Sequence, residues 1–93
     1  MDKKYQELLG AITKGYSNLI GLAVVIRKAD NLGLKIDNNG QVLEYKGDPV
    51  KLIENLLNEF VELSGDAAIK FCKDAIAEVL TKYPDIEIPS ILK

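Results

Sequence analysis

The sequence contains no histidine, and this absence removes several kinds of chemistry at once. Histidine is the commonest general base, it carries the proton in serine and cysteine triads, and its imidazole is a frequent metal ligand. Carboxylate or lysine chemistry stays open to this composition, but no motif in the chain calls for it. We therefore expect no catalytic residue, no metal site and no cofactor, and we expect that the protein is not an enzyme.

The chain is also poor in cysteine, in excess basic charge and in long apolar runs. Its single cysteine, Cys72, cannot form an internal disulfide, so no feature points to an oxidising compartment. A net charge of -2 argues against a nucleic-acid footprint and against a polybasic membrane anchor. The longest apolar run, residues 19–26, is too short to cross a bilayer, and the first ten residues have no signal-peptide core. We expect a cytoplasmic protein that binds neither nucleic acid nor membrane.

What the sequence does contain is enough apolar material for one small core. The 93 residues are 47% hydrophobic, which disfavours disorder and predicts a single domain over residues 1–93. A domain of this size often gains stability from a partner chain, because it buries only a modest fraction of its surface. Apolar residues at helical spacing predict one helical pair over about 3–32 and a second over 49–83. Residues 84–93 alternate apolar and acidic side chains beside prolines, which predicts an extended tail.

Glycine and proline mark the expected ends of these helices. Gly21 interrupts the first pair and Gly65 interrupts the second, while Gly33 is a typical residue after a helix C-terminus. Asp48 followed by Pro49 is a typical helix start, because the carboxylate caps free backbone N–H groups and proline is tolerated in the first turn.

The two helical pairs contain a similar phrase. YSNLIGLAVV at residues 16–25 and FVELSGDAAI at residues 60–69 share the pattern aromatic-x-x-Leu-x-Gly-x-Ala, at the shift that places Gly21 on Gly65. An internal duplication explains this match, and so does the ordinary resemblance of two amphipathic helix pairs broken by glycine. Either explanation favours a helix for residues 22–32, whose β-branched start would also suit a buried strand, because the second copy is helical in pattern. We therefore predict a mainly α (α+β) fold in which two helix–Gly–helix units close on each other.

Between the helical pairs, residues 34–46 predict a β-hairpin, with its strands over about 34–45. Asn39-Gly40 is the preferred pair for a two-residue type I′ turn. This turn places apolar side chains on one face of the hairpin and an opposite-charge pair on the other. The expected pairs are Asp37–Val42, Ile36–Leu43, Lys35–Glu44 and Leu34–Tyr45.

The apolar face of this hairpin needs a cover, because a lone two-stranded hairpin is marginal in water. The C-terminal tail or the hairpin of a second copy would supply that cover. We therefore predict a homodimer or higher oligomer, and the alternative is that the hairpin folds onto its own helices. The candidate assembly surface consists of Leu34, Ile36, Leu43, Tyr45, Ile86 and Ile88.

Two functions fit these features. The first is a small self-associating protein-interaction or regulatory module without catalytic activity, whose C-terminal tail adds a strand to the sheet edge of a protein partner. The second is a helical domain that binds a small molecule in an apolar pocket between the two helix pairs. Small residues at that place would leave room for a ligand, or would only permit close helix packing. The candidate pocket residues are Gly21, Ala23, Gly65, Ala67 and Ala68.

Three patterns that resemble functional sites are better explained by structure. Residues 10–16, GAITKGY, have the glycine spacing of a phosphate loop, but Tyr16 stands where that loop needs lysine. Residues 35–46 would place lysines at two positions where a calcium loop needs oxygen ligands. Cys72 lies on the apolar side of its helix, so we expect it in the core rather than as a nucleophile.

Overall fold

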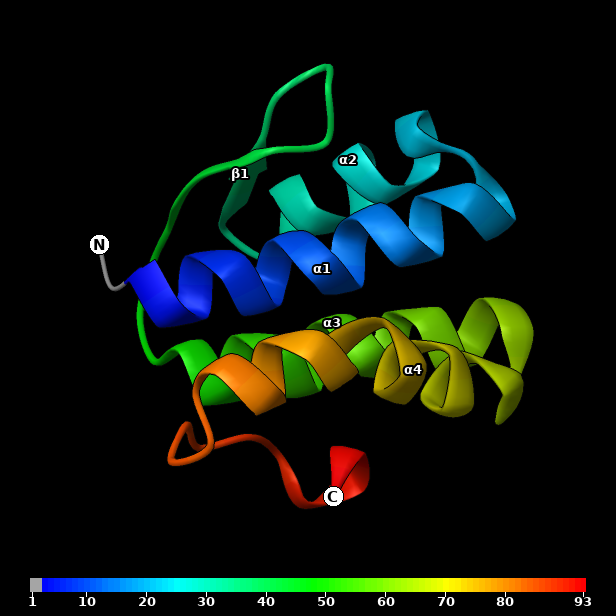
Figure 1. Cartoon of the computed structure of the whole chain (residues 1–93). Coiled ribbons are helices and arrows are strands. Elements are labelled where there is room, and N and C mark those ends of the chain that lie inside the picture. The colour runs from blue at the N-terminus through cyan, green and yellow to red at the C-terminus, as the bar shows by residue number, and fades with distance from the viewer. Residues whose placement is uncertain (1–2) are drawn as a thin grey trace.

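The computed structural model describes residues 3–93 as two helical pairs joined by a β-hairpin (Figure 1). In Figure 1 the first pair lies against the second, the hairpin lies beside the first pair, and the tail lies beside the second. The predicted fold class is therefore confirmed, while residues 1 and 2 of the predicted domain lie outside the described residues. The elements are α1 (Lys3–Ile20), α2 (Leu22–Asn31), β1 (Leu34–Ile36), β2 (Val42–Tyr45), α3 (Pro49–Ser64), α4 (Ala67–Lys82) and the 3₁₀ turn η1 (Ser90–Leu92).

The helices begin and end where the sequence provides the signals. Asp48 caps α3, since its Oδ1 accepts a hydrogen bond from the N–H of Val50 at 2.9 Å, and Pro49 occupies the first turn. Gly21 and Gly65 separate the helices of each pair and have φ values of +97° and +68°. Glycine adopts such values at little cost. A Cβ at either glycine would meet no atom within 4 Å, so backbone conformation and not close helix packing requires glycine there.

Close helix packing occurs at Gly15 instead. A Cβ at Gly15 would lie 2.9 Å from the Cβ of Ala75, which is closer than real side chains approach. Helices α1 and α4 therefore meet through a glycine and an alanine. Gly10 lies about one and a half turns earlier on α1 and is different, because a Cβ added there would lie at an ordinary contact distance of 4.0 Å from Cγ2 of Val42.

The core lies between the two pairs and contains an aromatic stack. The rings of Tyr16 on α1 and Phe60 on α3 have centroids 3.8 Å apart, and Phe71 meets Tyr16 edge-on at 6.4 Å. The buried Tyr16 hydroxyl donates to the carbonyl oxygen of Phe60 at 3.0 Å and contacts Oγ of Ser64. Tyr16 and Phe60 are the aromatic residues of the repeated phrase, so the two phrases meet in the core. Their origin by duplication stays a prediction.

The hairpin is present, but its turn differs from the predicted one. A type I′ turn needs positive φ at both central residues, and no non-glycine residue in the described part of the chain has a positive φ. The N–H of Gly40 donates to the carbonyl of Asp37 at 3.0 Å, so Asn38 and Asn39 are the central residues and Gly40 follows at φ +83°. The Asp37 carboxylate also accepts hydrogen bonds from the N–H groups of Asn39 and Gln41. The prediction of a two-residue type I′ turn at Asn39-Gly40 is wrong, because these local hydrogen bonds stabilise a three-residue loop.

The longer loop shifts the strand register by one residue, and a bulge then restores it. Ile36 pairs with Val42 and not with Leu43, because the loop uses one residue more than predicted. Leu43 is the unpaired residue of this bulge, and its side chain is 57% exposed. The predicted pairs Asp37–Val42 and Ile36–Leu43 are therefore wrong, because Val42 pairs with Ile36 and the N–H of Asp37 donates to the carbonyl of Gln41. The two outer pairs are confirmed. The observed pairs are Leu34–Tyr45, Lys35–Glu44 and Ile36–Val42.

The hairpin is covered by helices of its own chain. Leu34 and Val42 are buried in the core. Gln6 on α1 donates a hydrogen bond from Nε2 to the carbonyl oxygen of Val42 at 2.9 Å, which fixes β2 to the helix. The hairpin thus folds onto its own helices, and its apolar face needs no second chain.

The tail packs on the second helical pair and is also hydrogen-bonded to α1. Ile86 and Leu92 are buried in the core, and the Tyr5 hydroxyl donates to the carbonyl oxygen of Glu87 at 2.9 Å. Residues 86–89 have no regular secondary structure and lead into η1. The hairpin and the tail lie on opposite sides of the molecule in Figure 1, so the tail does not cover the hairpin within one chain.

Candidate functional site

The structure separates the six residues of the predicted assembly surface. Those of the hairpin and those of the tail lie on opposite sides of the molecule, and several of them already pack inside the chain. They therefore form no single exposed surface. Their exposure runs from buried (Leu34, Ile86) through half-buried (Ile36, Tyr45, Ile88) to exposed (Leu43).

Four of the five predicted pocket residues lie at the surface, at one end of the helical bundle. Gly21, Ala23, Gly65 and Ala67 are exposed, and Ala68 is buried in the core. The hollows found between elements of the fold are lined by other residues. The four exposed positions flank the interhelical turns, which Figure 1 shows at the same end of the molecule.

Two large apolar side chains are exposed at this same end. Leu19 is 51% exposed and Leu63 is 48% exposed. Each follows an aromatic residue of the core stack by three positions and precedes an interhelical glycine by two. A single exposed leucine is ordinary, but apolar side chains gathered in one place are typical of an interaction surface. We define the leucine surface as Leu19, Gly21, Ala23, Leu63, Gly65 and Ala67.

Acidic side chains lie beside one half of the leucine surface. Every charged residue between positions 8 and 29, on α1 and α2, is basic. The exposed acidic residues Glu62 and Asp66 lie beside Leu63 on the other half. Lys14, Arg27 and Lys28 all lie outside the leucine surface, and Lys28 pairs with Glu59, so the two acidic side chains are the charges nearest to the surface in sequence.

A charged cluster that the sequence did not indicate joins α1 to the end of α4. Oε1 of Glu7 lies 2.9 Å from Nζ of Lys82. The Lys82 ammonium, and after it the Tyr83 side chain, hold the pKa of Glu7 below its ordinary value. The Glu7 carboxylate in turn raises the pKa of Lys82 and of Tyr83. Local spacing pairs Lys82 with Glu78 on the same helix, whereas the observed partner lies 75 positions away and leaves no local signal.

The geometry of this cluster favours a structural role. The second carboxylate oxygen of Glu7, Oε2, is covered by the surrounding atoms and accepts no hydrogen bond of regular geometry from residues 3–93. A ligand would have to displace covering atoms to reach it. The Glu7–Lys82 ion pair therefore fixes α4 against α1.

Cys72 lies in the core, as predicted from its position on the apolar side of its helix. Burial raises the pKa of its thiol to about 11, so the thiolate that reacts as a nucleophile is disfavoured at neutral pH. Within residues 3–93, three or more His, Cys, Asp or Glu side chains nowhere come together as a metal site would require. No helix of that part is long and apolar enough to cross a membrane.

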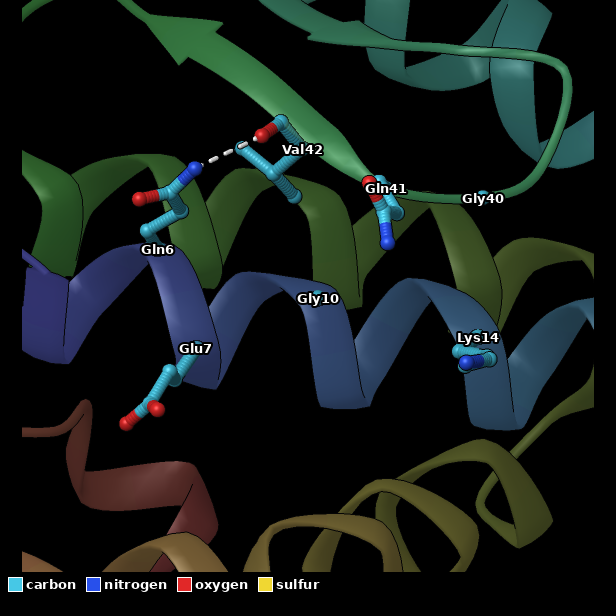
Figure 2. Close-up of a pocket in the computed structure, with 7 residues that line it drawn as sticks. All are labelled: Gln6, Glu7, Gly10, Lys14, Gly40, Gln41 and Val42. Carbon is cyan, nitrogen blue, oxygen red and sulfur yellow. Dashed lines mark hydrogen bonds between the residues drawn. The ribbon is translucent and has the colours of Figure 1, made fainter.

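A hollow of about 420 Å³ lies between α1 and the hairpin (Figure 2). Gln6, Gly10 and Lys14 recur every four residues and so share one face of α1. Gln41 extends from the hairpin toward that helix in Figure 2, while Glu7 points away from the hairpin. Sequence reasoning missed this hollow, because no local pattern places residues 40–42 against α1. The lining residues are Gln6, Glu7, Gly10, Lys14, Gly40, Gln41 and Val42.

Comparison of the chain with known proteins finds no matching family model, no matching curated protein and no matching solved structure. A function for this chain therefore has to rest on its own surfaces and hollows. The leucine surface and the hollow between α1 and the hairpin are two such places within residues 3–93.

Proposed function

We propose that the protein is a small self-associating interaction module without catalytic activity, and that two copies meet through the leucine surface. The observation that carries this proposal is the exposure of Leu19 and Leu63 at the same end of the bundle. Most other large apolar side chains of the described residues are at least partly covered by their own chain. This proposal moves the predicted assembly surface from the hairpin and tail to the interhelical turns.

A second copy fits this surface because the surface has two similar halves. Each half consists of an exposed leucine, a glycine and an alanine at the same spacing. A two-fold axis would place Leu19 of one copy against Leu63 of the other, and the same contact would form twice.

The expected association is weak and reversible. Covering a half-exposed leucine contributes about 1 kcal/mol, so the four leucines of a two-fold pair contribute about 4 kcal/mol. Association costs at least about 4 kcal/mol in lost freedom of motion, and the remaining apolar and polar contacts of the surface must supply the surplus. We therefore expect a dissociation constant in the micromolar to millimolar range. Such a module would assemble in response to its local concentration.

Light scattering across a concentration series tests this proposal. The mass of the wild-type protein should rise from monomer toward dimer with concentration, and Leu63→Ser should keep the protein monomeric. Leu43→Ser is the matched control, because Leu43 is even more exposed than Leu63 but lies on the hairpin, and it should behave as the wild type. A wild-type mass that stays monomeric at every concentration, or a Leu63→Ser protein that still dimerises, would contradict the proposal.

A further inference from the structure

Gly10 stands in the middle of α1 without a packing reason. Glycine inside a helix is less stable than alanine, because its backbone loses more freedom on folding. Gly15 is explained by Ala75, whose Cβ leaves no room for a side chain. At Gly10 a Cβ would lie 4.0 Å from Cγ2 of Val42, so alanine would fit the fold. Because Gly10 has no Cβ, it leaves space in the hollow between α1 and the hairpin, which it lines.

The groups around this hollow suit a ligand that carries one negative charge. Lys14 is exposed at the hollow and forms no ion pair within residues 3–93. Glu7, the acidic residue of the lining, points away from the hairpin in Figure 2 and is neutralised by Lys82 at 2.9 Å. The net charge offered to a ligand is therefore the positive charge of Lys14. The Gln41 amide adds a hydrogen-bonding group above the helix.

We propose that this hollow binds a small organic carboxylate. The carboxylate pairs with Lys14, the apolar body of the ligand lies across Gly10 and against Val42, and the Gln41 amide bonds a polar group of the ligand. A volume of about 420 Å³ lies within the range of small-molecule sites. Gln6 supports the site by its hydrogen bond to Val42, which keeps the hairpin wall in place.

This site is separate from the leucine surface, so the two proposals fail independently. None of the residues that line the hollow belongs to the leucine surface, and Lys14 precedes Gly21 by seven residues, which corresponds to about 10 Å along a helix. Loss of self-association would leave the hollow intact, and a ligand in the hollow would not touch Leu19 or Leu63.

Amide chemical shifts of the ¹⁵N-labelled protein test the proposal directly. The probes are hexanoate, benzoate and N-acetylleucine, each compared with its uncharged amide. At least one carboxylate should shift the N–H signals of Gly10, Gly40 and Gln41 in a saturable way, and its amide should bind at least five-fold more weakly. No saturable shift at these signals with any of the three carboxylates would overturn the proposal, and so would equal binding of acid and amide.

Matched variants separate the ligand site from the fold. Gly10→Ala should raise the melting temperature of the free protein by a few degrees, because alanine favours the helix, and should weaken binding by narrowing the hollow. Gly15→Ala should lower the melting temperature through the clash with Ala75. A lower melting temperature for Gly10→Ala would show that this glycine serves the fold, and the proposal would lose its premise.

The charge of Lys14 is tested in the same titration. Lys14→Gln should weaken carboxylate binding about ten-fold, which is the scale of one hydrogen bond to a charged group. Lys70→Gln removes an exposed lysine that does not line the hollow and should leave binding unchanged. Equal binding by the Lys14→Gln and Lys70→Gln proteins would overturn the assignment of the carboxylate to Lys14.

Discussion

Tyr16 shows at the scale of one residue why the two halves of the chain depend on each other. Its ring stacks on Phe60 across the core, which buries apolar surface of both helical pairs. Its buried hydroxyl donates a hydrogen bond to the Phe60 carbonyl, so this polar group is not left without a partner. The sequence indicated that both aromatic residues begin the repeated phrase. It gave no sign that they stack on each other, because residues in separate elements are brought together only by the tertiary fold.

We expect the Tyr16→Phe substitution to lower the free energy of unfolding by at least about 1–1.5 kcal/mol, since it keeps the ring but removes the hydrogen bond to the Phe60 carbonyl and the contact with Ser64. Tyr45→Phe is the control, because Tyr45 is a half-buried residue at the end of β2, and it should change stability by less than about 0.5 kcal/mol. Urea unfolding followed by circular dichroism measures both values. Equal effects of the two substitutions would mean that the Tyr16 hydroxyl contributes nothing specific.

Residue types with a strong local role were predictable, and residues that act over long distances were not. Asp48 caps α3 as expected, because capping depends on neighbours two residues away. Glu7 gave no signal, because its partner Lys82 comes near only once α1 and α4 have packed. The same limit applies to Lys14 and Gly10, whose hollow exists only after the hairpin has docked on α1.

At the scale of elements, the hairpin illustrates how one side chain selects between two turns. Asn39-Gly40 suits a type I′ turn, but the Asp37 carboxylate accepts hydrogen bonds from two backbone N–H groups and favours the longer loop. The consequence reaches the core, because the longer loop exchanges Leu43 for Val42 on the buried side. Strand pairing away from the turn was predictable, since the bulge restores the expected register.

Replacement of Asp37 by alanine should therefore destabilise the hairpin, by about 1–2 kcal/mol for the two hydrogen bonds lost. The amide protons of the paired strand residues should exchange faster with solvent in this variant, while those of α3 stay protected. Asn38→Ala is the comparison, because the side-chain hydrogen bonds that hold the turn within residues 3–93 come from Asp37 and not from Asn38. Unchanged exchange in the hairpin of the Asp37→Ala protein would show that the loop forms without the carboxylate.

At the scale of the whole molecule, the Glu7–Lys82 ion pair makes stability depend on pH. The pKa of Glu7 is lowered in the fold, so the pair stabilises the protein above the ordinary value of 4.5, and this contribution is lost as the pH falls through the lowered pKa. The pKa of Lys82 is raised, so the contribution is complete below 10.5 and is lost as the pH rises beyond that value. The pair should therefore stabilise the fold between about pH 4.5 and pH 10.5.

The substitution Glu7→Gln tests this window. The wild type should be more stable than the variant at neutral pH, and the difference should shrink toward zero in acid, where the Glu7 carboxyl is neutral like the amide. Thermal unfolding measured from acid to neutral pH gives the difference at each step. Glu78→Gln, one turn from Lys82 on α4, should give a smaller effect, because the ion pair of Lys82 is with Glu7. A difference between wild type and Glu7→Gln that stays constant with pH would rule out the ion pair as its cause.

The overall arrangement of the molecule was predictable in outline. Two apolar helical pairs had to close on each other, and they do. The contact partners within that arrangement were not predictable from apolar periodicity. Ala75 packs against α1 at Gly15 because glycine has no side chain there, and the spacing of apolar residues does not indicate such a contact. The leucine surface was missed for a related reason, since Leu19 and Leu63 continue the apolar stripes of their helices and differ from core residues only in lying at the end of the bundle.

The measurement that tests the central proposal most directly is a dilution series of the protein with ¹³C-labelled leucine methyl groups. The methyl signals of Leu19 and Leu63 should shift and broaden together as the concentration rises, while the signal of the more exposed Leu43 stays constant. That result would show both that copies associate and where they meet. Methyl signals that do not respond to concentration, or a response centred on Leu43, would contradict the assignment of self-association to the leucine surface.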